Sequence, residues 1–305
     1  KKENENYSKT PVSLYYTSKR IINIENCTEK SNLRSKGLSA FAFDTQIDFS
    51  SSLAWFIERA TQEALEALQK KDLNHTLPDL SAVRMAISKA LGDYDEPFIG
   101  DTPPALFIRR KGDASQQYRI EELSDGYRTM LALVMDLARR MAVANKNTKW
   151  PEGQTVLHSP GVVLIDEVEL HLHPSWQQSV LPTLMEIFPN VQFIVTTHSP
   201  QVLTSIAAKH IRILKDGVVH SFTDETEGAE ACRVLEDVLL VSQRPAMLES
   251  VNKLARYAEL VYAEKWDSPE ATALRDELYK HYGSAEPRLK ELDLHIENSK
   301  WERGL

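Results

Sequence analysis

Gly161-Val-Val-Leu-Ile-Asp166-Glu167 is the stretch that decides the fold, because four apolar residues in a row lead directly into two carboxylates. An uninterrupted apolar run of this length is typical of a strand in a parallel sheet that is buried on both faces. A second such run, Val191 to Thr196, begins thirty residues after the first and ends shortly before His198. Parallel strands end at the same edge of their sheet, so we expect Asp166, Glu167 and His198 to lie close together.

Helices alternate with these strands along much of the chain. Apolar residues that recur every three or four positions predict helices at residues 52–71, 79–91, 125–144 and 175–188, with a further helix after Pro200. Shorter runs predict strands at residues 12–16, 20–24, 105–110 and 118–121, and Asp216-Gly217 predicts the turn of a hairpin between residues 211–214 and 218–222. This alternation indicates an α/β fold in which a parallel sheet is flanked by helices, whereas the pattern after Asp224 is helical only.

The composition excludes several classes of protein. Of 305 residues, 42% are apolar and 26% are charged, and only two are cysteines. These values fit a soluble chain with a hydrophobic core, and they exclude a disordered protein and a disulfide scaffold. The longest apolar stretches fall far short of the roughly 18 residues of a membrane span, and the polar first residues do not resemble a secretory peptide. We therefore expect a cytoplasmic protein without a membrane partner.

The net charge of −8 is unevenly distributed. Residues 224–305 contain 18 acidic and 11 basic residues, a net charge of −7, and the rest of the chain is nearly neutral. Neither part has the broad basic face that is typical of a nucleic-acid-binding protein. Arg109, Arg110 and Lys111 form a local basic cluster, which we interpret as the solvated end of a strand.

Ser124, Asp125 and Gly126 open the helix predicted at residues 125–144. Ser124 stands at the N-cap position, and Gly126 lets another molecule approach the first turn closely. The free backbone N–H groups and the positive end of the helix dipole make such a turn a candidate anion site, with each interaction contributing roughly 0.3 to 1 kcal/mol. An ordinary serine cap explains the same residues.

Taken in order, these three motifs resemble those of the ATP-binding-cassette (ABC) class of ATPases, in the branch that includes the SMC, RecF and OLD-like proteins. The serine-glycine turn is similar to the signature motif, the strand before Asp166 and Glu167 to the Walker B strand, and the segment around His198 to the switch histidine. Residues 166–174 resemble a bacterial subgroup with the pattern Asp-Glu-x-x-x-x-Leu-His-Pro. The sequence Leu-Ser-Asp-Gly at residues 123–126 and the helical tail are most similar to the PtuA-type ATPases of Septu and retron antiphage defence systems.

The resemblance implies an ATP hydrolase that uses ATP and Mg²⁺. Asp166 would hold Mg²⁺ through water, Glu167 would be the general base, and His198 would contact the γ-phosphate. The turn from Ser124 to Gly126 would contact the γ-phosphate of ATP held by a second subunit, with the Asp125 carboxylate nearby.

The resemblance also implies partners and a division of the chain into parts. The partners are a second copy in a homodimer or higher oligomer, an HNH-type nuclease subunit similar to PtuB, and a retron reverse transcriptase with its DNA and RNA. The parts are residues 1–51 as the remainder of an N-terminal ATPase lobe, 52–97 as a helical insertion, 98–223 as the ATPase lobe with the three motifs, and 224–305 as an acidic helical tail. No Walker A pattern, Gly-x-x-x-x-Gly-Lys-Ser/Thr, occurs in the sequence, and the first residue is not Met, so we expect a preceding segment to carry this loop.

Several alternatives stay open. A DNA-repair clamp that grips duplex DNA in its ATP-bound state would contain a long heptad coiled coil or a basic channel, and the sequence shows neither. A metal nuclease fused to an ATPase would need another apolar strand with paired acids after Asp224, where none occurs. His171 and His173 are spaced to share a metal ion, but no cysteine is nearby, and we favour a structural or interface contact. We interpret Trp176 as a core residue and Arg128 as a surface or interface charge.

Overall fold

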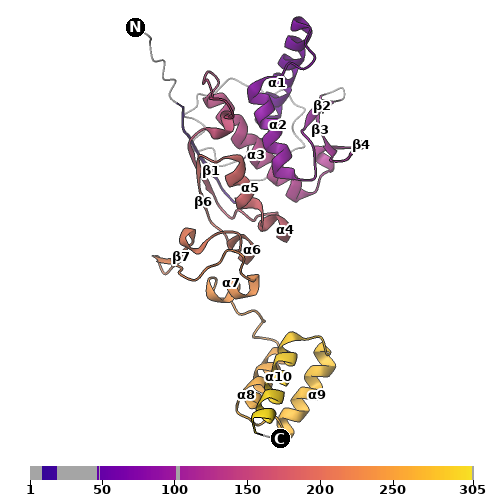
Figure 1. The fold of residues 1–305 in the computed structure, drawn as a ribbon, viewed down its shortest axis with the longest axis vertical. Coiled ribbons are helices and arrows are strands. Elements are labelled where there is room, and N and C mark those ends of the chain that lie inside the picture. Colours follow the sequence, from indigo (N-terminus) through magenta and orange to yellow (C-terminus); the bar gives the residue numbers. More distant parts are fainter. Residues whose placement is uncertain (1–8, 19–46, 48, 101–103, 304–305) are drawn as a thin grey trace. The chain divides into compact units, whose positions relative to one another are not determined.

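The computed structural model describes residues 9–18, 47, 49–100 and 104–303. The chain forms two compact units that divide between Val234 and Leu235. Figure 1 shows the strands in the first unit and a group of helices in the second. Across the described ranges, no helix combines the length and the apolar character that a bilayer crossing requires.

A parallel sheet carries the predicted motifs of the first unit. Its strands follow the order β1 (Val12–Tyr16), β5 (Gly161–Ile165) and β6 (Val191–Val195), and both pairs are parallel. The last residues of the three strands pair with one another, so the strands end level at one edge of the sheet. The parallel pairing expected from the two apolar runs is confirmed, but burial on both faces is not, because Tyr15, Leu164 and Ile194 form an exposed row on one face.

Helix α3 (Asp125–Ala144) lies at the centre of the hydrophobic core. Every residue from Thr129 to Ala142 is buried, because the helix contacts β1 and also α1 (Phe49–Lys70) and α2 (Pro78–Leu91). A helix that is covered on all sides belongs to the interior of its unit. Helices therefore flank the parallel sheet, as Figure 1 shows, and the predicted α/β class is confirmed.

Two antiparallel groups of strands complete the first unit. They are β2 (Phe98–Gly100), β3 (Ala105–Arg110) and β4 (Asp113–Arg119), and the hairpin of β7 (Arg212–Lys215) and β8 (Val218–Ser221). Asp216 and Gly217 have φ angles of 51° and 76°, the left-handed values that a two-residue hairpin turn requires. The predicted hairpin is confirmed. The short helical segments are η2 (Ile120–Glu122), η3 (Val156–His158), α4 (Pro174–Gln177), α5 (Val180–Ile187), α6 (Pro200–Leu203), η4 (Ala208–His210) and α7 (Ala231–Asp237).

The structure corrects two of the predicted elements. The single helix expected at residues 175–188 is divided into α4 and α5. Pro182 explains the break, since a proline has no N–H for the carbonyl four residues earlier, at Gln178, and its ring collides with that carbonyl. The strand expected at residues 118–121 begins earlier, as β4, and gives way to η2. The strand predicted at residues 20–24 lies outside the described residues.

The second unit is helical, as the pattern after Asp224 predicted. Its long helices are α8 (Glu249–Tyr262), α9 (Pro269–Tyr282) and α10 (Pro287–Glu302). They share a small core in which Tyr257, Val261 and Leu292 are fully covered. This core is separate from the core around α3, so the unit has its own source of hydrophobic stability.

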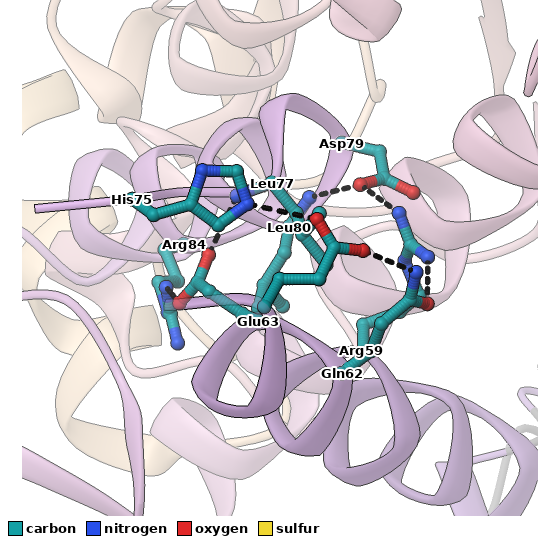
Figure 2. A network of polar contacts seen from close by, with 9 residues as sticks. Arg59, Gln62, Glu63, His75, Leu77, Asp79, Leu80 and Arg84 are labelled. Carbon is teal, nitrogen blue, oxygen red and sulfur yellow. Dashed lines mark hydrogen bonds and ion pairs between the residues drawn. The ribbon is translucent and has the colours of Figure 1, made fainter. Parts of the chain in front are cut away.

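Polar contacts fix α2 against α1 (Figure 2). Arg59 Nη2 lies 2.6 Å from Asp79 Oδ1, and Arg84 Nη1 lies 2.6 Å from Glu63 Oε1. The second oxygen of Glu63 accepts a hydrogen bond of 2.7 Å from the backbone N–H of Leu77, immediately before α2. Because these side chains are mostly buried, the ion pairs are better shielded from water than ordinary surface pairs. They set the position of α2, which covers α3.

A buried ionic network joins α3 to α1 and β1. The carboxylate of Asp136 in α3 accepts hydrogen bonds from Tyr16 Oη (2.9 Å) and Ser52 Oγ (3.1 Å). It also accepts bonds from Arg139 Nη2 (2.9 Å) and Arg140 Nε (2.7 Å). Asp136 is completely buried, so these bonds replace the water that an ionised carboxylate would otherwise need. The network holds the end of β1, and thus the edge of the sheet, against the core.

Asp136→Asn should strongly destabilise the first unit. The substitution leaves two buried arginines without their shared countercharge, a change that typically costs about 3–5 kcal/mol. Guanidinium denaturation of the 305-residue chain measures this loss of unfolding free energy. Asp224→Asn, at an exposed position, should change the unfolding free energy by less than about 0.5 kcal/mol. Equal stability of the two variants would show that Asp136 does not organise the core.

Tyr16 should make the stability depend on alkaline pH. Burial, and then the charge of Asp136, raise the pKa of Tyr16 well above 10. The folded chain therefore keeps a proton that the unfolded chain releases above pH 10, so this contribution is present below pH 10 and falls as the pH rises beyond it. Tyr16→Phe should be less stable at pH 8 by about 1–3 kcal/mol because it loses a hydrogen bond to a carboxylate.

Urea denaturation of the parent chain and Tyr16→Phe between pH 8 and pH 11.5 measures this effect. The stability advantage of the parent should shrink by up to about 1.4 kcal/mol for each pH unit above 10. An advantage that stays constant over this range would contradict the raised pKa.

Candidate functional site

The hydroxyl group of Thr196 helps to join the ends of β5 and β6. Thr196 Oγ1, one residue past β6, donates to Asp166 Oδ1 (2.5 Å) and accepts from the backbone N–H of Glu167 (2.8 Å). Two backbone bonds continue the pairing, from Thr196 N to the carbonyl of Ile165 (3.0 Å) and from Val168 N to the carbonyl of Thr196 (3.1 Å). Asp166 and Glu167 therefore lie where the sheet ends, and Thr196, which follows β6, orients the Asp166 carboxylate.

Glu169 connects the acidic segment to His198. Its Oε1 accepts a hydrogen bond of 2.7 Å from the backbone N–H of His198. Its other oxygen, Oε2, is buried and has no hydrogen-bond partner among the residues that the structure describes. The imidazole of His198 is exposed, and within the described ranges it forms no hydrogen bond. The segments that carry Asp166, Glu167 and His198 are thus held at one edge of the sheet, and the imidazole is accessible there.

The chain after β5 turns by means of left-handed residues. Glu167 has φ of 48° and His171 has φ of 64°, although neither is a glycine. Successive turns are closed by backbone bonds from Leu170 to the carbonyl of Glu167 and from Leu172 to that of Glu169, both 2.9 Å. Left-handed backbone at such residues costs free energy and is concentrated at functional sites. This local strain makes residues 167–172 a constrained loop.

The turn that opens α3 lies against this loop. A Cβ atom added to Gly126 would be 3.5 Å from the carbonyl oxygen of His171 and 3.9 Å from the nitrogen of His173. The ring of Tyr127 packs edge-on against Trp176, with 4.6 Å between their centroids. Trp176 is half-buried and packs against the core, in agreement with its interpretation as a core residue. One chain therefore places the start of α3 beside the loop that follows the acidic pair.

The start of α3 is open to solvent. Ser124 and Asp125 are exposed, and the Ser124 side chain makes no capping hydrogen bond. The carboxylate of Asp125 is paired with Arg128 one turn later, so part of its negative charge is balanced within the helix. In an ordinary cap, the serine side chain accepts a hydrogen bond from an N–H group of the first turn. The Ser124 side chain makes no such bond.

His173 and His171 have different structural roles. The Nδ1 atom of His173 lies 2.9 Å from Ser175 Oγ at the start of α4, and His171 provides the left-handed turn. Within the described ranges, no group of three or more His, Cys, Asp or Glu side chains is placed to hold a metal ion. These contacts favour the structural reading of the two histidines.

The sequence motifs do not identify Thr196 and Glu169 as residues of this edge. In the sequence, Thr196 is only the last residue of an apolar run. The level ending of the parallel strands brings it opposite the acidic pair. Glu169 occupies a variable position of the Asp-Glu-x-x-x-x-Leu-His-Pro pattern. Its bond to His198 depends on a turn that the sequence does not reveal.

Comparison with known families identifies the domain. Residues 2–204 match the model of a family described as an AAA domain, and that description also names the AbiEii toxin and a type IV TA system. The chain belongs to this AAA-domain family. The match includes the α3 turn, the acidic pair and His198, and it ends one residue past α6.

Several named proteins are similar to this AAA-domain chain. It is 44% identical over 181 residues to a retron Ec83 probable ATPase of Escherichia coli, which covers 59% of this chain and 32% of that protein. It is 29% identical over 253 residues to a retron Vc95 probable ATPase of Vibrio cholerae serotype O1 biovar El Tor, with 68% and 48% covered. A Septu protein PtuA of Bacillus mycoides (strain KBAB4) is 38% identical over 103 residues, with 34% and 13% covered. The expected similarity to retron ATPases and PtuA is confirmed, and the chain spans less than half the length of these relatives.

A chain from a structural study of SMC ATPases is also similar, with 18% identity and a TM-score of 0.35. The similarity covers 55% of this chain and 94% of that one. At this TM-score it supports no statement about function.

Thr196→Val should loosen the edge of the sheet. Valine keeps the shape of threonine but removes the bonds to Asp166 and to the Glu167 N–H, so we expect a loss of about 1–3 kcal/mol in unfolding free energy. Thr196→Ser keeps the hydroxyl and should lose less than about 1 kcal/mol. Urea denaturation measures both variants, with Thr223→Val at an exposed position as the control. A valine variant as stable as the serine variant would mean that the hydroxyl does not hold the two segments together.

Proposed function

We propose that this chain is the catalytic part of an ATPase in a bacterial antiphage defence system, and that it dimerises around ATP and Mg²⁺. The observation that supports it most is the arrangement of Asp166, Glu167 and His198 at the level ends of β5 and β6. Membership of the AAA-domain family and similarity to proteins named retron ATPases support the same activity.

The donor set at this edge fits a hydrated Mg²⁺. This ion prefers oxygen ligands, keeps several waters, and is usually bound by one or two carboxylates together with substrate phosphates. Asp166 is such a carboxylate, and the bond from Thr196 orients it at the end of β5. The described residues contain no cluster that would enclose a metal with protein ligands alone. When bound with ATP, Mg²⁺ would offset the negative charge of the phosphates.

Glu167 is proposed to take the proton from the attacking water. Its backbone N–H is held by Thr196, and its left-handed φ turns the chain immediately after the strand, so its side chain leaves the backbone in a different direction from that of a strand residue. A carboxylate positioned as a general base contributes about 10² to 10⁴ in rate.

His198 is proposed to contact the γ-phosphate. A neutral imidazole has one donor and one acceptor nitrogen, so it suits a phosphate oxygen or the attacking water. Glu169 fixes the backbone of His198 and leaves its imidazole exposed, which favours a contact with a ligand over a contact within the fold.

The turn from Ser124 to Gly126 is proposed to complete the site of a second copy. Ser124 is exposed and makes no capping hydrogen bond, and Arg128 balances the Asp125 carboxylate, so the positive end of α3 can attract an anion. A γ-phosphate bound to the partner copy would supply that anion, and ATP would then join the two copies. The Walker A pattern does not occur in this sequence, and the chain spans less than half the length of its relatives, so the tests with nucleotide are designed for the full-length protein.

The proposed effector is an HNH-type nuclease, with a retron reverse transcriptase and its nucleic acid as further partners. The similarity to retron proteins and to PtuA supports this part of the proposal. The helical second unit, which has its own core, is the proposed docking module for the effector. Purification of the full-length protein from its native operon, followed by identification of the associated polypeptides and nucleic acid, tests the partners.

Glu167→Gln should trap ATP in the full-length protein. Glutamine cannot accept the proton from water, so hydrolysis should fall by about 10² to 10⁴, whereas ATP binding should persist because Asp166 and His198 are unchanged. Steady-state phosphate release and equilibrium binding of labelled ATP measure the two properties.

Glu152→Gln, at an exposed position, is the matched control and should hydrolyse ATP at the parent rate. Hydrolysis by Glu167→Gln at the parent rate would exclude Glu167 as the base. Absence of ATP binding and hydrolysis in the parent protein itself would overturn the proposed function.

A further inference from the structure

The outer face of the sheet formed by β2, β3 and β4 carries aromatic and cationic side chains. Cross-strand pairing places Phe98, Phe107 and Arg119 in one row, because Phe107 pairs with both of the other residues. Arg109 lies two residues after Phe107, on the same face of β3. We call these four residues the aromatic-arginine face; their three strands lie together within the first unit (Figure 1).

The four side chains contact one another in a chain of stacked groups. The rings of Phe98 and Phe107 are stacked, with 5.7 Å between their centroids and 24° between their planes. The guanidinium carbon of Arg109 is 4.1 Å from the centre of the Phe98 ring, and that of Arg119 is 5.5 Å from the centre of the Phe107 ring. Both guanidiniums thus lie over ring faces, where the ring quadrupole attracts a cation.

A glycine on the neighbouring strand makes room for this arrangement. A Cβ atom added to Gly100 in β2 would be 3.1 Å from the Phe107 ring and 3.7 Å from the Phe98 ring. Any larger residue at this position would press on Phe107. The rings therefore lie close against the backbone of β2 at Gly100.

The aromatic-arginine face is not part of the core. Leu106 and Ile108, which alternate with Phe107 on β3, point into the core and are buried, whereas Phe98 and Phe107 are half-buried and both arginines are exposed. The sheet is anchored through its inner face, so the core does not require aromatic rings on the outer face.

Arg109 retains its capacity to bind an anion. Within the described ranges, no carboxylate lies within 4.0 Å of its guanidinium and no hydrogen bond occupies it, although the backbone N–H of Asp95 binds the Arg109 carbonyl. A guanidinium that rests on an aromatic ring and has unoccupied N–H donors can bind a phosphate, and its outer plane can stack on a base.

We propose that the aromatic-arginine face binds single-stranded nucleic acid. Proteins bind single strands by stacking unpaired bases on aromatic rings or guanidinium planes while cations contact the backbone, and this face offers both groups side by side. A duplex hides its bases within the stack and would use only the charges. The inference goes beyond the proposed ATPase activity and does not depend on it, since no residue of the acidic edge takes part.

Fluorescence anisotropy with a labelled 20-nucleotide oligothymidine tests the proposal on the 305-residue chain without nucleotide. Arg109→Glu should weaken binding by about tenfold or more, because it removes a phosphate contact and a stacking plane, and it should reduce the salt dependence by about one unit of the log–log slope. Phe107→Leu keeps an apolar side chain but removes the ring, and it should weaken binding roughly fivefold or more. Circular dichroism confirms that each variant is folded.

Lys215→Glu, at an exposed position of the β7–β8 hairpin, is the matched control because it changes the net charge by the same amount as Arg109→Glu. It should alter the affinity by less than about twofold. Equal losses in the two glutamate variants would overturn the proposal in favour of a general charge effect, and the absence of binding at low salt would overturn it outright. Tighter binding of a 20-base-pair duplex would also overturn the proposal, because it would indicate a duplex site. Displacement of the oligonucleotide by polyglutamate at equal charge concentration would overturn it by indicating an acidic-peptide site.

Discussion

The level ending of β5 and β6 is the constraint on which the candidate site depends. Parallel pairing holds the last residues of the two strands opposite each other, so whatever follows each strand emerges at the same edge. The hydroxyl of Thr196 and the carboxylate of Glu169 then join the two emerging segments by side-chain hydrogen bonds. Displacement of β6 by one residue would separate all of these groups, so the chemistry of the site is a consequence of strand register.

Helix α3 links that edge to the stability of the unit. Its middle is buried on every side and contains Asp136, whose carboxylate binds Tyr16 at the end of β1. Ser124 and Asp125 at its start are exposed, and the half-buried Gly126 lies against the loop that follows the acidic pair. The buried middle of α3 thus binds the end of β1, and the N-terminus of the same helix lies beside the candidate site. The buried network, which is costly to desolvate, is placed where it orients the strands that carry the site.

The sequence allowed the parallel strands, the α3 boundaries and the β7–β8 hairpin to be predicted, because each has a local signature of apolar periodicity or turn residues. The break between α4 and α5 was missed although Pro182 signals it, since the apolar periodicity continues across the proline. The partners of Asp136 were beyond prediction, because Tyr16 and Ser52 are 120 and 84 residues away in the chain. The side-chain links at the site edge were missed for a related reason: they depend on register and on left-handed turns at Glu167 and His171.

The most direct test is a structure of the full-length Glu167→Gln variant with Mg²⁺ and ATP, determined by electron cryomicroscopy. The proposed function predicts two copies face to face, with the His198 imidazole within hydrogen-bonding distance of the γ-phosphate and the Ser124 turn of the other copy against the same phosphate. Nucleotide bound away from the ends of β5 and β6, or His198 directed away from the γ-phosphate, would contradict it.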